Sequence, residues 1–245
     1  MIFVGILRGL NDRCFRRVTS GLSARESQRG RLSKTPKRFL LLLELLGAFI
    51  AAPSLLYFWA PVPLLPVLLV FAAACGLVLT RDPAFDRANL WRPSALAQGA
   101  RAMLIRFAIC AAVLFAIVCL SAPGLLFALP RQRPVLWLLI VLLYPLLSVY
   151  PQELIYRAYF LHRYRMLFPK RWLLLALNVL LFGYVHIIFH NWIAVILSVA
   201  GGTAFVITYE RSRSTLLVSI EHSLFGCLLF TIGLGRFFYT GHFLR

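Results

Sequence analysis

The sequence has very few acidic residues and few charged residues of any kind. Only 8 of its 245 residues are Asp or Glu, and all charged residues together make up 14% of the chain. Soluble domains carry about 25% charged residues and about 45–50% apolar residues. Because 61% of this chain is hydrophobic, an ordinary soluble enzyme, a disordered chain and a coiled coil are excluded. The composition predicts an all-α, polytopic helical membrane protein with about seven transmembrane helices and short loops.

Cysteine is also scarce, and its spacing is not that of a metal or redox site. None of the five cysteines forms a CxxC pair, and all but the first lie in apolar stretches: Cys14, Cys75, Cys110, Cys119 and Cys227. In such surroundings a free cysteine behaves as a small hydrophobic residue. The sequence therefore predicts neither a disulfide framework nor a cysteine-bound metal.

Long apolar runs dominate the rest of the chain. A transmembrane helix needs roughly 20 apolar residues, and we expect spans at residues 39–58, 64–79, 103–121, 135–150, 172–189, 192–208 and 216–234. The polar stretch 80–101, which contains Trp91 and Pro93, reads as an interfacial segment. The predicted regions are a basic cytoplasmic arm (1–38), a first transmembrane part (39–134), a core that holds the polar motifs (135–235) and a tail (236–245).

The basic residues predict the orientation. With the N-terminus inside, segments 1–38, 80–101, 152–171 and 209–214 hold 21 of the 26 Lys and Arg residues, and the outer segments hold only 4. Cytoplasmic loops carry such an excess. The chain begins without a small-residue cleavage site, so we expect no cleaved signal peptide. The basic arm fits an anionic lipid surface. No basic domain remains outside the spans, so the lipid bilayer is an expected partner and nucleic acid is not.

Ionisable residues inside the apolar spans are the most informative feature. Each costs about 2.5–3.5 kcal/mol at a helix centre, so such residues are functional candidates. All but the first lie in the C-terminal half: Glu44, Glu153, Arg157, His186, His190, Glu221 and His222. Three separate segments that each contribute Glu or His indicate a common intramembrane site. That site could activate water, bind a metal through Glu153, His186 and His222, or relay protons.

Each candidate also has a purely structural interpretation. Glu153 and Arg157 are four residues apart and share a helix face, so they could form a simple ion pair or hold a carboxylate in a polar cavity. A lone buried histidine is often only a core residue, and His190, at the end of its span, fits a water-facing position. Glu221 and His222 point about 100° apart on a helix. We therefore expect only one of these two residues to face the same cavity as His186.

Three short motifs occur in order along the C-terminal half. The first is Gln152-Glu153-Leu154-Ile155-Tyr156-Arg157, the second is Phe182-Gly183-Tyr184-Val185-His186, and the third is His222 with Gly226 four residues on. Together they resemble the CAAX protease and bacteriocin-processing (CPBP, or abortive-infection) family of intramembrane proteases, which includes the type II CAAX prenyl endopeptidases. The resemblance covers about residues 135–235, and the first half of the chain resembles the family only in hydropathy.

The resemblance implies an intramembrane endopeptidase of the bacterial cytoplasmic membrane. It would use activated water to cleave a peptide or a lipidated protein near the membrane surface. In the family, the first Glu of motif one and the His of motif two are thought to activate water. The His of motif three and a following Asn are thought to support the oxyanion. This glutamate-dependent chemistry requires no cofactor, whereas an older interpretation makes the same residues zinc ligands, here Glu153, His186 and His222.

Two positions depart from the family pattern. Gln152 stands where the family has the first Glu, and an amide cannot accept a proton as a base. Gly226 stands at the Asn position and offers no side-chain donor. Glu153 could take over the base role if the helix is locally unwound near Pro151. Otherwise the chemistry differs, or the protein is an inactive scaffold that binds another membrane protein or acts in regulation or self-immunity. A small transporter is a further alternative, although no internal repeat supports it.

Overall fold

The structure is a computed structural model that describes residues 37–59 and 63–239. Within these ranges it contains helices and turns and no strand, so the all-α prediction is confirmed. Most of the predicted basic arm and the end of the predicted tail lie outside the described residues, as does Cys14.

Six helices among the described residues are long and apolar enough to cross a membrane. They are Lys37–Phe58, Leu64–Arg81, Ser94–Ser121, Pro134–Arg163, Arg171–Phe189 and Trp192–Ser212. A seventh apolar helix, Thr215–Thr231, is shorter. Every predicted span thus coincides with an apolar helix. The protein is an integral membrane protein.

The chain divides into two compact units, residues 1–45 and 46–245. The described part of the first unit is helical and includes Glu44. The second unit contains η1 (Gly47–Ala51), α2 (Ala52–Phe58), α3 (Leu64–Arg81), α4 (Ser94–Ser121), α5 (Ala128–Gln132), the long helix Pro134–Arg163, α9 (Arg171–Val185), α10 (Trp192–Ser212) and α11 (Thr215–Thr231). Short 3₁₀ turns lie at η2 (Arg87–Asn89), η3 (Pro123–Leu125), η6 (His186–Phe189) and η7 (Leu234–Phe238).

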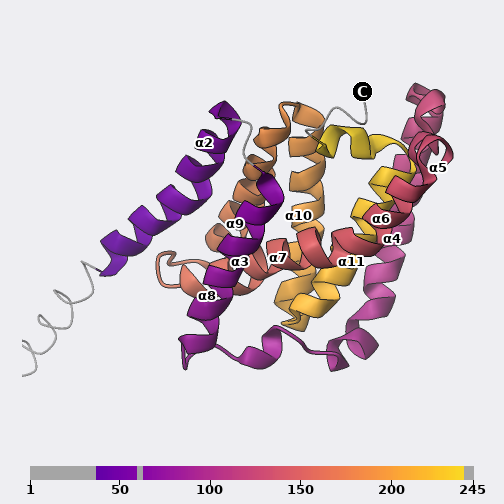
Figure 1. Cartoon of the computed structure of the whole chain (residues 1–245). Helices are drawn as coiled ribbons and strands as arrows, with labels where there is room; N and C mark the ends of the chain where they lie inside the picture. The colour runs from indigo at the N-terminus through magenta and orange to yellow at the C-terminus, as the bar shows by residue number, and fades with distance from the viewer. Residues whose placement is uncertain (1–36, 60–62, 240–245) are drawn as a thin grey trace, which may run out of the picture. The chain divides into compact units, whose positions relative to one another are not determined.

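Neighbouring helices of the second unit pack in a simple order. Helix α9 contacts α10, α10 contacts α11, and α11 contacts α4 (Figure 1). The middle of the long helix Pro134–Arg163 lies between α3 and α11 and contacts both. Residues on this helix are therefore surrounded by helices from both halves of the sequence.

The long helix corrects one prediction. We expected this span to end at residue 150 and a cytoplasmic loop to begin at 152, but the chain stays helical to Arg163. It runs through α6 (Pro134–Tyr144), a π-helical turn η4 (Pro145–Val149), α7 (Tyr150–Glu153), a second π-helical turn η5 (Leu154–Tyr159) and α8 (Phe160–Arg163). Proline lacks the N–H that an α-helical turn requires, and a π-helical turn shifts the hydrogen-bonding pattern without ending the helix. The local unwinding that Glu153 would need to take over the base role is absent at this residue, which keeps helical angles (φ −68°, ψ −33°).

The predicted interfacial segment 80–101 is also partly helical. Helix α4 begins at Ser94, directly after Pro93, so only the part between Arg81 and Ser94 connects the two spans. Two aspartates organise this connection. Asp82 accepts a hydrogen bond from the Ala84 N–H (2.8 Å), and Asp86 accepts one from the Ala88 N–H (3.0 Å).

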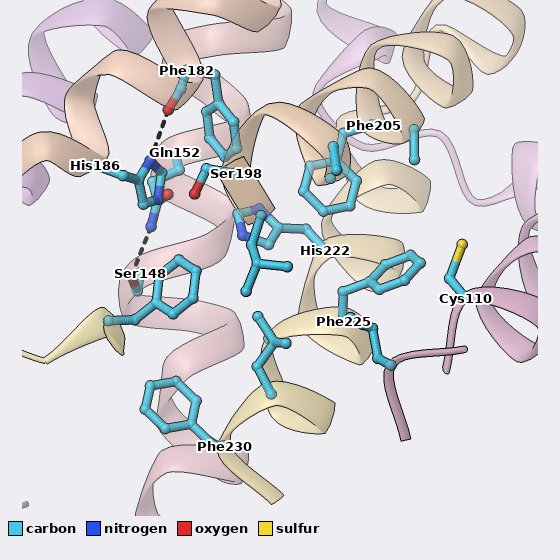
Figure 2. A pocket seen from close by; sticks show the side chains of 18 of the residues that line it. Cys110, Ser148, Gln152, Phe182, His186, Ser198, Phe205, His222, Phe225 and Phe230 are labelled. Carbon is cyan, nitrogen blue, oxygen red and sulfur yellow. Dashed lines mark hydrogen bonds between the residues drawn. The ribbon is translucent and has the colours of Figure 1, made fainter. Parts of the chain in front are cut away.

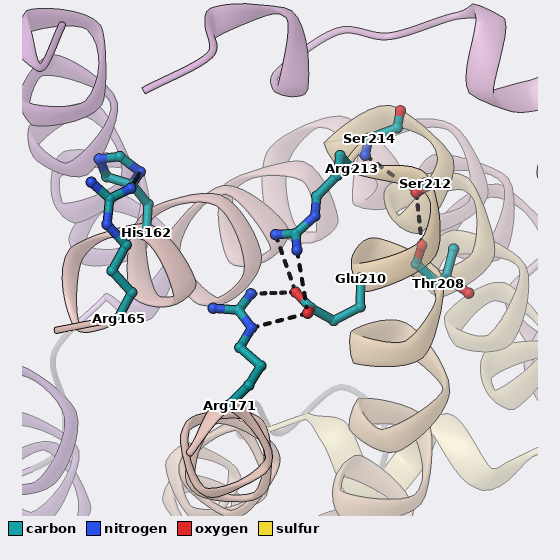
Figure 3. A network of polar contacts seen from close by, with 8 residues as sticks. All are labelled: His162, Arg165, Arg171, Thr208, Glu210, Ser212, Arg213 and Ser214. Atoms are coloured by element: carbon teal, nitrogen blue, oxygen red, sulfur yellow. Dashed lines mark hydrogen bonds and ion pairs between the residues drawn. The ribbon is translucent and has the colours of Figure 1, made fainter. Parts of the chain in front are cut away.

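Ion pairs join the ends of helices at the polar edge of this unit. Glu210, near the end of α10, accepts a hydrogen bond from Arg171 Nε at 3.0 Å and pairs with Arg213 at 3.3 Å (Figure 3). His162 Nε2 lies 2.7 Å from Asp82 Oδ2 and so connects α8 to the loop after α3. These contacts fix the helix ends around the apolar interior.

Candidate active site

Two adjoining cavities lie inside the second unit. The first, of about 410 Å³, is lined mainly by apolar side chains. Its polar groups come from Ser148, Gln152, His186, Ser198 and His222 (Figure 2) and from Tyr144. The second, of about 520 Å³, is lined by residues from η1, α2 and α3 together with Gln152 and His186. Gln152 and His186 therefore border both cavities, and a few polar groups converge there in an apolar surrounding.

His186 presents one nitrogen to the cavities. Helix α9 ends at Val185, and the 3₁₀ turn that begins at His186 follows directly. The Nδ1 atom of His186 lies 2.7 Å from the Phe182 carbonyl oxygen. A carbonyl only accepts hydrogen bonds, so Nδ1 carries the hydrogen and Nε2 holds the lone pair. His186 is 7% exposed, and its neutral tautomer is set for accepting a proton from a molecule in the cavity.

His222 is held in a different way. Its Nδ1 atom lies 2.8 Å from Glu153 Oε1, and its ring stacks on Phe205 at a centroid distance of 4.5 Å. The other ring nitrogen, Nε2, lies 3.3 Å from the Tyr144 hydroxyl at the cavity wall. A carboxylate stabilises the protonated imidazole, whereas the carbonyl beside His186 has no net charge. The Nδ1 atoms of the two histidines therefore face different acceptors, a neutral carbonyl for His186 and a carboxylate for His222.

Glu153 and Arg157 lie behind His222 rather than in the cavity. Both side chains are 0% exposed, and Arg157 Nε lies 3.2 Å from Glu153 Oε2. Arg157 Nη1 donates to Asn178 Oδ1 at 2.6 Å, and Asn178 Nδ2 donates to the Tyr156 carbonyl at 2.6 Å. The guanidinium also lies 4.7 Å from the Phe182 ring. This network fixes the Glu153 carboxylate, which has no contact with either cavity.

Gln152, and not Glu153, is the residue of motif one that borders the cavities. Its Nε2 atom donates to Ser148 Oγ, one helical turn earlier, at 2.8 Å. This bond directs the amide toward the space beside His186 (Figure 2). Because the helix is not unwound, the geometry does not support the hypothesis that Glu153 rotates into the position of Gln152.

The remaining polar candidates lie outside this site. His190 is exposed, has a left-handed backbone (φ 56°) and stacks on Tyr57 at 4.4 Å, which agrees with a water-facing position. Glu221 pairs with Arg106 of α4, which also donates to Thr208. Only His222 of the adjacent pair lines the cavity, as expected from the helical angle between them.

The sequence analysis missed four residues that are partners of its candidates, three at this site and one beside Glu221 outside it. They are Tyr144 beside His222, Ser148 beside Gln152, Asn178 beside Arg157 and Arg106 beside Glu221. A signal existed for two of them. Asn178 is an amide and Arg106 a charge inside an apolar span, where a polar group requires a partner. Nothing in the sequence distinguished Tyr144 or Ser148 from other residues of their helix.

The donor set does not fit a zinc ion. Across residues 37–59 and 63–239, no three His, Cys, Asp or Glu side chains are arranged to hold a metal. Glu153 would have to be one ligand, but its two carboxylate oxygens face His222 and Arg157. Only the Nε2 atoms of His186 and His222 remain, one ligand fewer than a catalytic zinc site uses.

Comparisons with known proteins agree with the motifs. Residues 131–228 match a family model described as Rce1-like, type II CAAX prenyl endopeptidase Rce1-like. Searches of curated proteins and of solved structures found no match. The matched segment contains all three motifs and all six residues named above that contribute polar groups to the first cavity, so the predicted resemblance is confirmed for this part of the chain.

Proposed function

Because residues 131–228 carry the features of the type II CAAX prenyl endopeptidase family, we propose that the protein is an intramembrane endopeptidase that hydrolyses a peptide bond with activated water and without a metal. One observation carries the proposal. Two imidazoles have their Nδ1 atoms bound to different acceptors, a carbonyl for His186 and a carboxylate for His222, and both line one cavity. When the surroundings favour the neutral form of one group and the protonated form of another, the first group can act as a base and the second as an acid.

His186 acts as the general base. Water in the cavity attacks the carbonyl carbon of the substrate while Nε2 of His186 takes one of its protons. The carbonyl π electrons move to oxygen, which becomes the oxyanion. When the tetrahedral intermediate collapses, the carbon–nitrogen bond breaks and the departing amine takes the proton from His186. The electron pair of the broken bond stays on the amine nitrogen, the proton has passed from water to the amine, and His186 is neutral again.

His222 acts as the electrophile that stabilises the oxyanion. The carboxylate of Glu153, 2.8 Å away, supports the protonated imidazole, so Nε2–H points a charged donor into the cavity. Arg157 pairs with Glu153, and Asn178 fixes Arg157. Glu153 and Arg157 are thus positioning residues in this mechanism, because neither contacts the cavity.

Gln152 orients the attacking water. Its Nε2 atom is engaged by Ser148, which leaves the amide oxygen as an acceptor for a water hydrogen beside His186. An amide cannot hold the transferred proton, so the base role falls to His186 alone. This predicts a slow enzyme compared with one that has a carboxylate at this position.

An inactive scaffold that binds another membrane protein is the second candidate function. The identities of Gln152 and Gly226 favour it, because the family resemblance assigns catalytic groups to both positions. The contacts that hold the Nδ1 atoms of His186 and His222, with both rings lining one cavity, favour the enzyme.

Cleavage by matched variants tests the proposal. The full chain is purified in detergent and incubated with a library of apolar peptides, and products are measured by mass spectrometry. His186→Asn should lower cleavage by about 10²–10⁴-fold, the usual contribution of a general base. His190→Asn is the control, because His190 lies on the same segment outside the cavities. If wild type and His186→Asn cleave equally, or if wild type cleaves no peptide, the scaffold function is preferred.

We also propose that the N-terminus lies in the cytoplasm, the C-terminus lies outside, and the membrane is a bacterial cytoplasmic membrane. The charge bias supports this orientation, although Arg157 leaves the count of loop charges because it is buried in a helix. A reporter enzyme fused after Arg245 should be active only outside. Activity of that fusion in the cytoplasm would contradict the count of seven spans.

A further inference from the structure

Tyr144 and Gly226 form a matched pair at the wall of the first cavity. Tyr144 is the last residue of α6, and Gly226 lies in α11. A Cβ atom added at Gly226 would overlap the Tyr144 ring and its hydroxyl oxygen. Gly226 is helical, so the requirement at this position is for space. The phenol of Tyr144 therefore occupies the volume that a side chain at position 226 would need.

The Tyr144 hydroxyl lies beside the His222 ring. Its oxygen lies 3.3 Å from His222 Nε2, and its ring is held edge-on by Phe230 at 5.7 Å. An N–H hydrogen bond to an oxygen is ordinarily 2.7–3.2 Å long. The longer separation means that the hydroxyl can turn to a ligand in the cavity at little cost.

Other hydroxyls of the cavity are less suited to this position. Ser148 accepts the hydrogen bond from Gln152 on the opposite side of the site. Ser198 lines the cavity, but among the described residues no hydrogen bond connects it to either imidazole. Of these three hydroxyls, that of Tyr144 is therefore the one that lies next to His222 Nε2.

We propose that the Tyr144 hydroxyl is a second oxyanion donor and performs the role that Gly226 cannot. This inference rests on the proposed function and adds a catalytic residue to it. When the oxyanion forms, the O–H of Tyr144 and the Nε2–H of protonated His222 both donate to it. Neither proton is transferred, and when the intermediate collapses His222 Nε2–H again donates to the Tyr144 hydroxyl oxygen. The phenol then supplies a preorganised dipole in an apolar, water-poor cavity, where such donors are most effective.

Removal of the hydroxyl is the first part of the test. Tyr144→Phe keeps the ring over Gly226 and removes only the donor, so kcat for the best peptide of the library should fall by about 10²-fold with KM unchanged. Tyr150→Phe is the matched control. It lies in the same long helix and loses a hydrogen bond to the Leu90 carbonyl (3.2 Å), but Tyr150 lines neither cavity. Its kcat should stay within twofold of wild type.

Exchange of the pair is the second part. Gly226→Asn alone should lose activity because the added side chain collides with Tyr144. The double variant Tyr144→Ala with Gly226→Asn makes room for an amide donor, and it should cleave about 10-fold faster than Tyr144→Ala. Thermal unfolding of every variant in detergent separates loss of the donor from loss of the fold.

The outcomes separate this inference from the proposed function. Active wild type together with a Tyr144→Phe variant of equal kcat overturns the role of Tyr144 and leaves the endopeptidase function intact. A double variant no faster than Tyr144→Ala also overturns it. Wild type without any cleavage overturns the proposed function itself, and the role of Tyr144 with it.

Discussion

Glu153 and Glu210 both bind arginine, but their surroundings differ. Glu153 and Arg157 are 0% exposed and lie between the packed helices. Glu210 and Arg171 are 19% and 38% exposed at the helix ends (Figure 3). Water can replace a lost partner at the helix ends. It cannot do so in the interior, where Glu153 contacts Arg157 and His222, and Arg157 contacts Asn178. The chain thus has one carboxylate whose partner is essential and another whose partner is replaceable.

The same difference distinguishes the carboxylate that supports the candidate active site from the carboxylate that only stabilises the fold. The Glu210 pairs connect the ends of α9 and α10 and contact no cavity, so they contribute only to the fold. The Glu153 network ends on His222 at the cavity wall. Because a buried ion pair is often no more stable than an apolar replacement, its retention here fits a role in orienting and charging His222.

The largest effect is expected from breaking the buried pair. Arg157→Met removes the arginine from the buried Glu153 carboxylate and leaves it with His222 alone of these two partners, which costs about 3–5 kcal/mol. Thermal unfolding in detergent measures the loss. The control, Arg171→Met, removes one of two arginines from a partly exposed carboxylate and should cost about 0.2–1 kcal/mol.

A double variant sharpens this comparison. Glu153→Gln removes the charge that Arg157→Met leaves behind, so the two changes together should cost less than Arg157→Met alone. Equal stability losses in Arg157→Met and Arg171→Met would contradict the distinction between the interior and the helix ends.

An intermediate effect is expected at Glu221, whose partner is only partly buried. Glu221 is 0% exposed but Arg106 is 26% exposed, so water can reach part of the site after the arginine is lost. Arg106→Met should therefore cost about 1.5–3 kcal/mol, the contribution of a hydrogen bond to a charged group. Cleavage by the surviving folded protein should be unchanged, because neither residue lines the cavities. A loss of kcat without a loss of stability would show that this pair acts on the site.

A smaller effect, in the opposite direction, is expected from Gln152→Glu. The new carboxylate would border both cavities beside His186 and stabilise its protonated form, so the cleavage rate should rise by about 10-fold, or about 1.4 kcal/mol in the barrier. Peptide cleavage in detergent measures it. The matched control is Gln132→Glu, which lies in α5 away from the cavities. A lower rate in Gln152→Glu would indicate that the neutral amide is required.

Much of the architecture followed from hydropathy alone. Apolar runs predicted all seven helices, since 20 residues without charge have few alternatives to a membrane span. The end of the fourth span was wrong because Pro151 and the polar Gln152-Glu153 pair resemble a helix end. The two π-helical turns that carry the helix past Pro145 and Pro151 depend on packing against α3 and α11, which no local pattern encodes.

The site residues could be predicted as a set but not in their arrangement. The cost of burying Glu153, Arg157, His186 and His222 indicated that they need partners. Which of Gln152 and Glu153 borders the cavity depends on how the long helix is rotated about its axis. That rotation depends on contacts with α3 and α11. Tyr144 was missed for the same reason. Its partners Gly226 and His222 lie about 80 residues away in the sequence and meet it only in the folded chain.

The smallest effect is expected from Asp82 at the helix ends. A hydrogen bond from His162, then one from the Ala84 N–H, holds the pKa of the Asp82 carboxyl below its ordinary value. The folded protein therefore binds this proton less readily than the unfolded chain. The stabilisation is complete above the unfolded pKa, about 3.9, and is lost as the pH falls through the lower folded value. The unfolding temperature of wild type should exceed that of Asp82→Asn by a constant margin from pH 7 to pH 5, and the margin should shrink below about pH 4. When both proteins also carry His162→Gln, the decrease of this margin below about pH 4 should become smaller. A margin that does not change down to pH 3 would show that the Asp82–His162 contact contributes nothing to the stability of this edge.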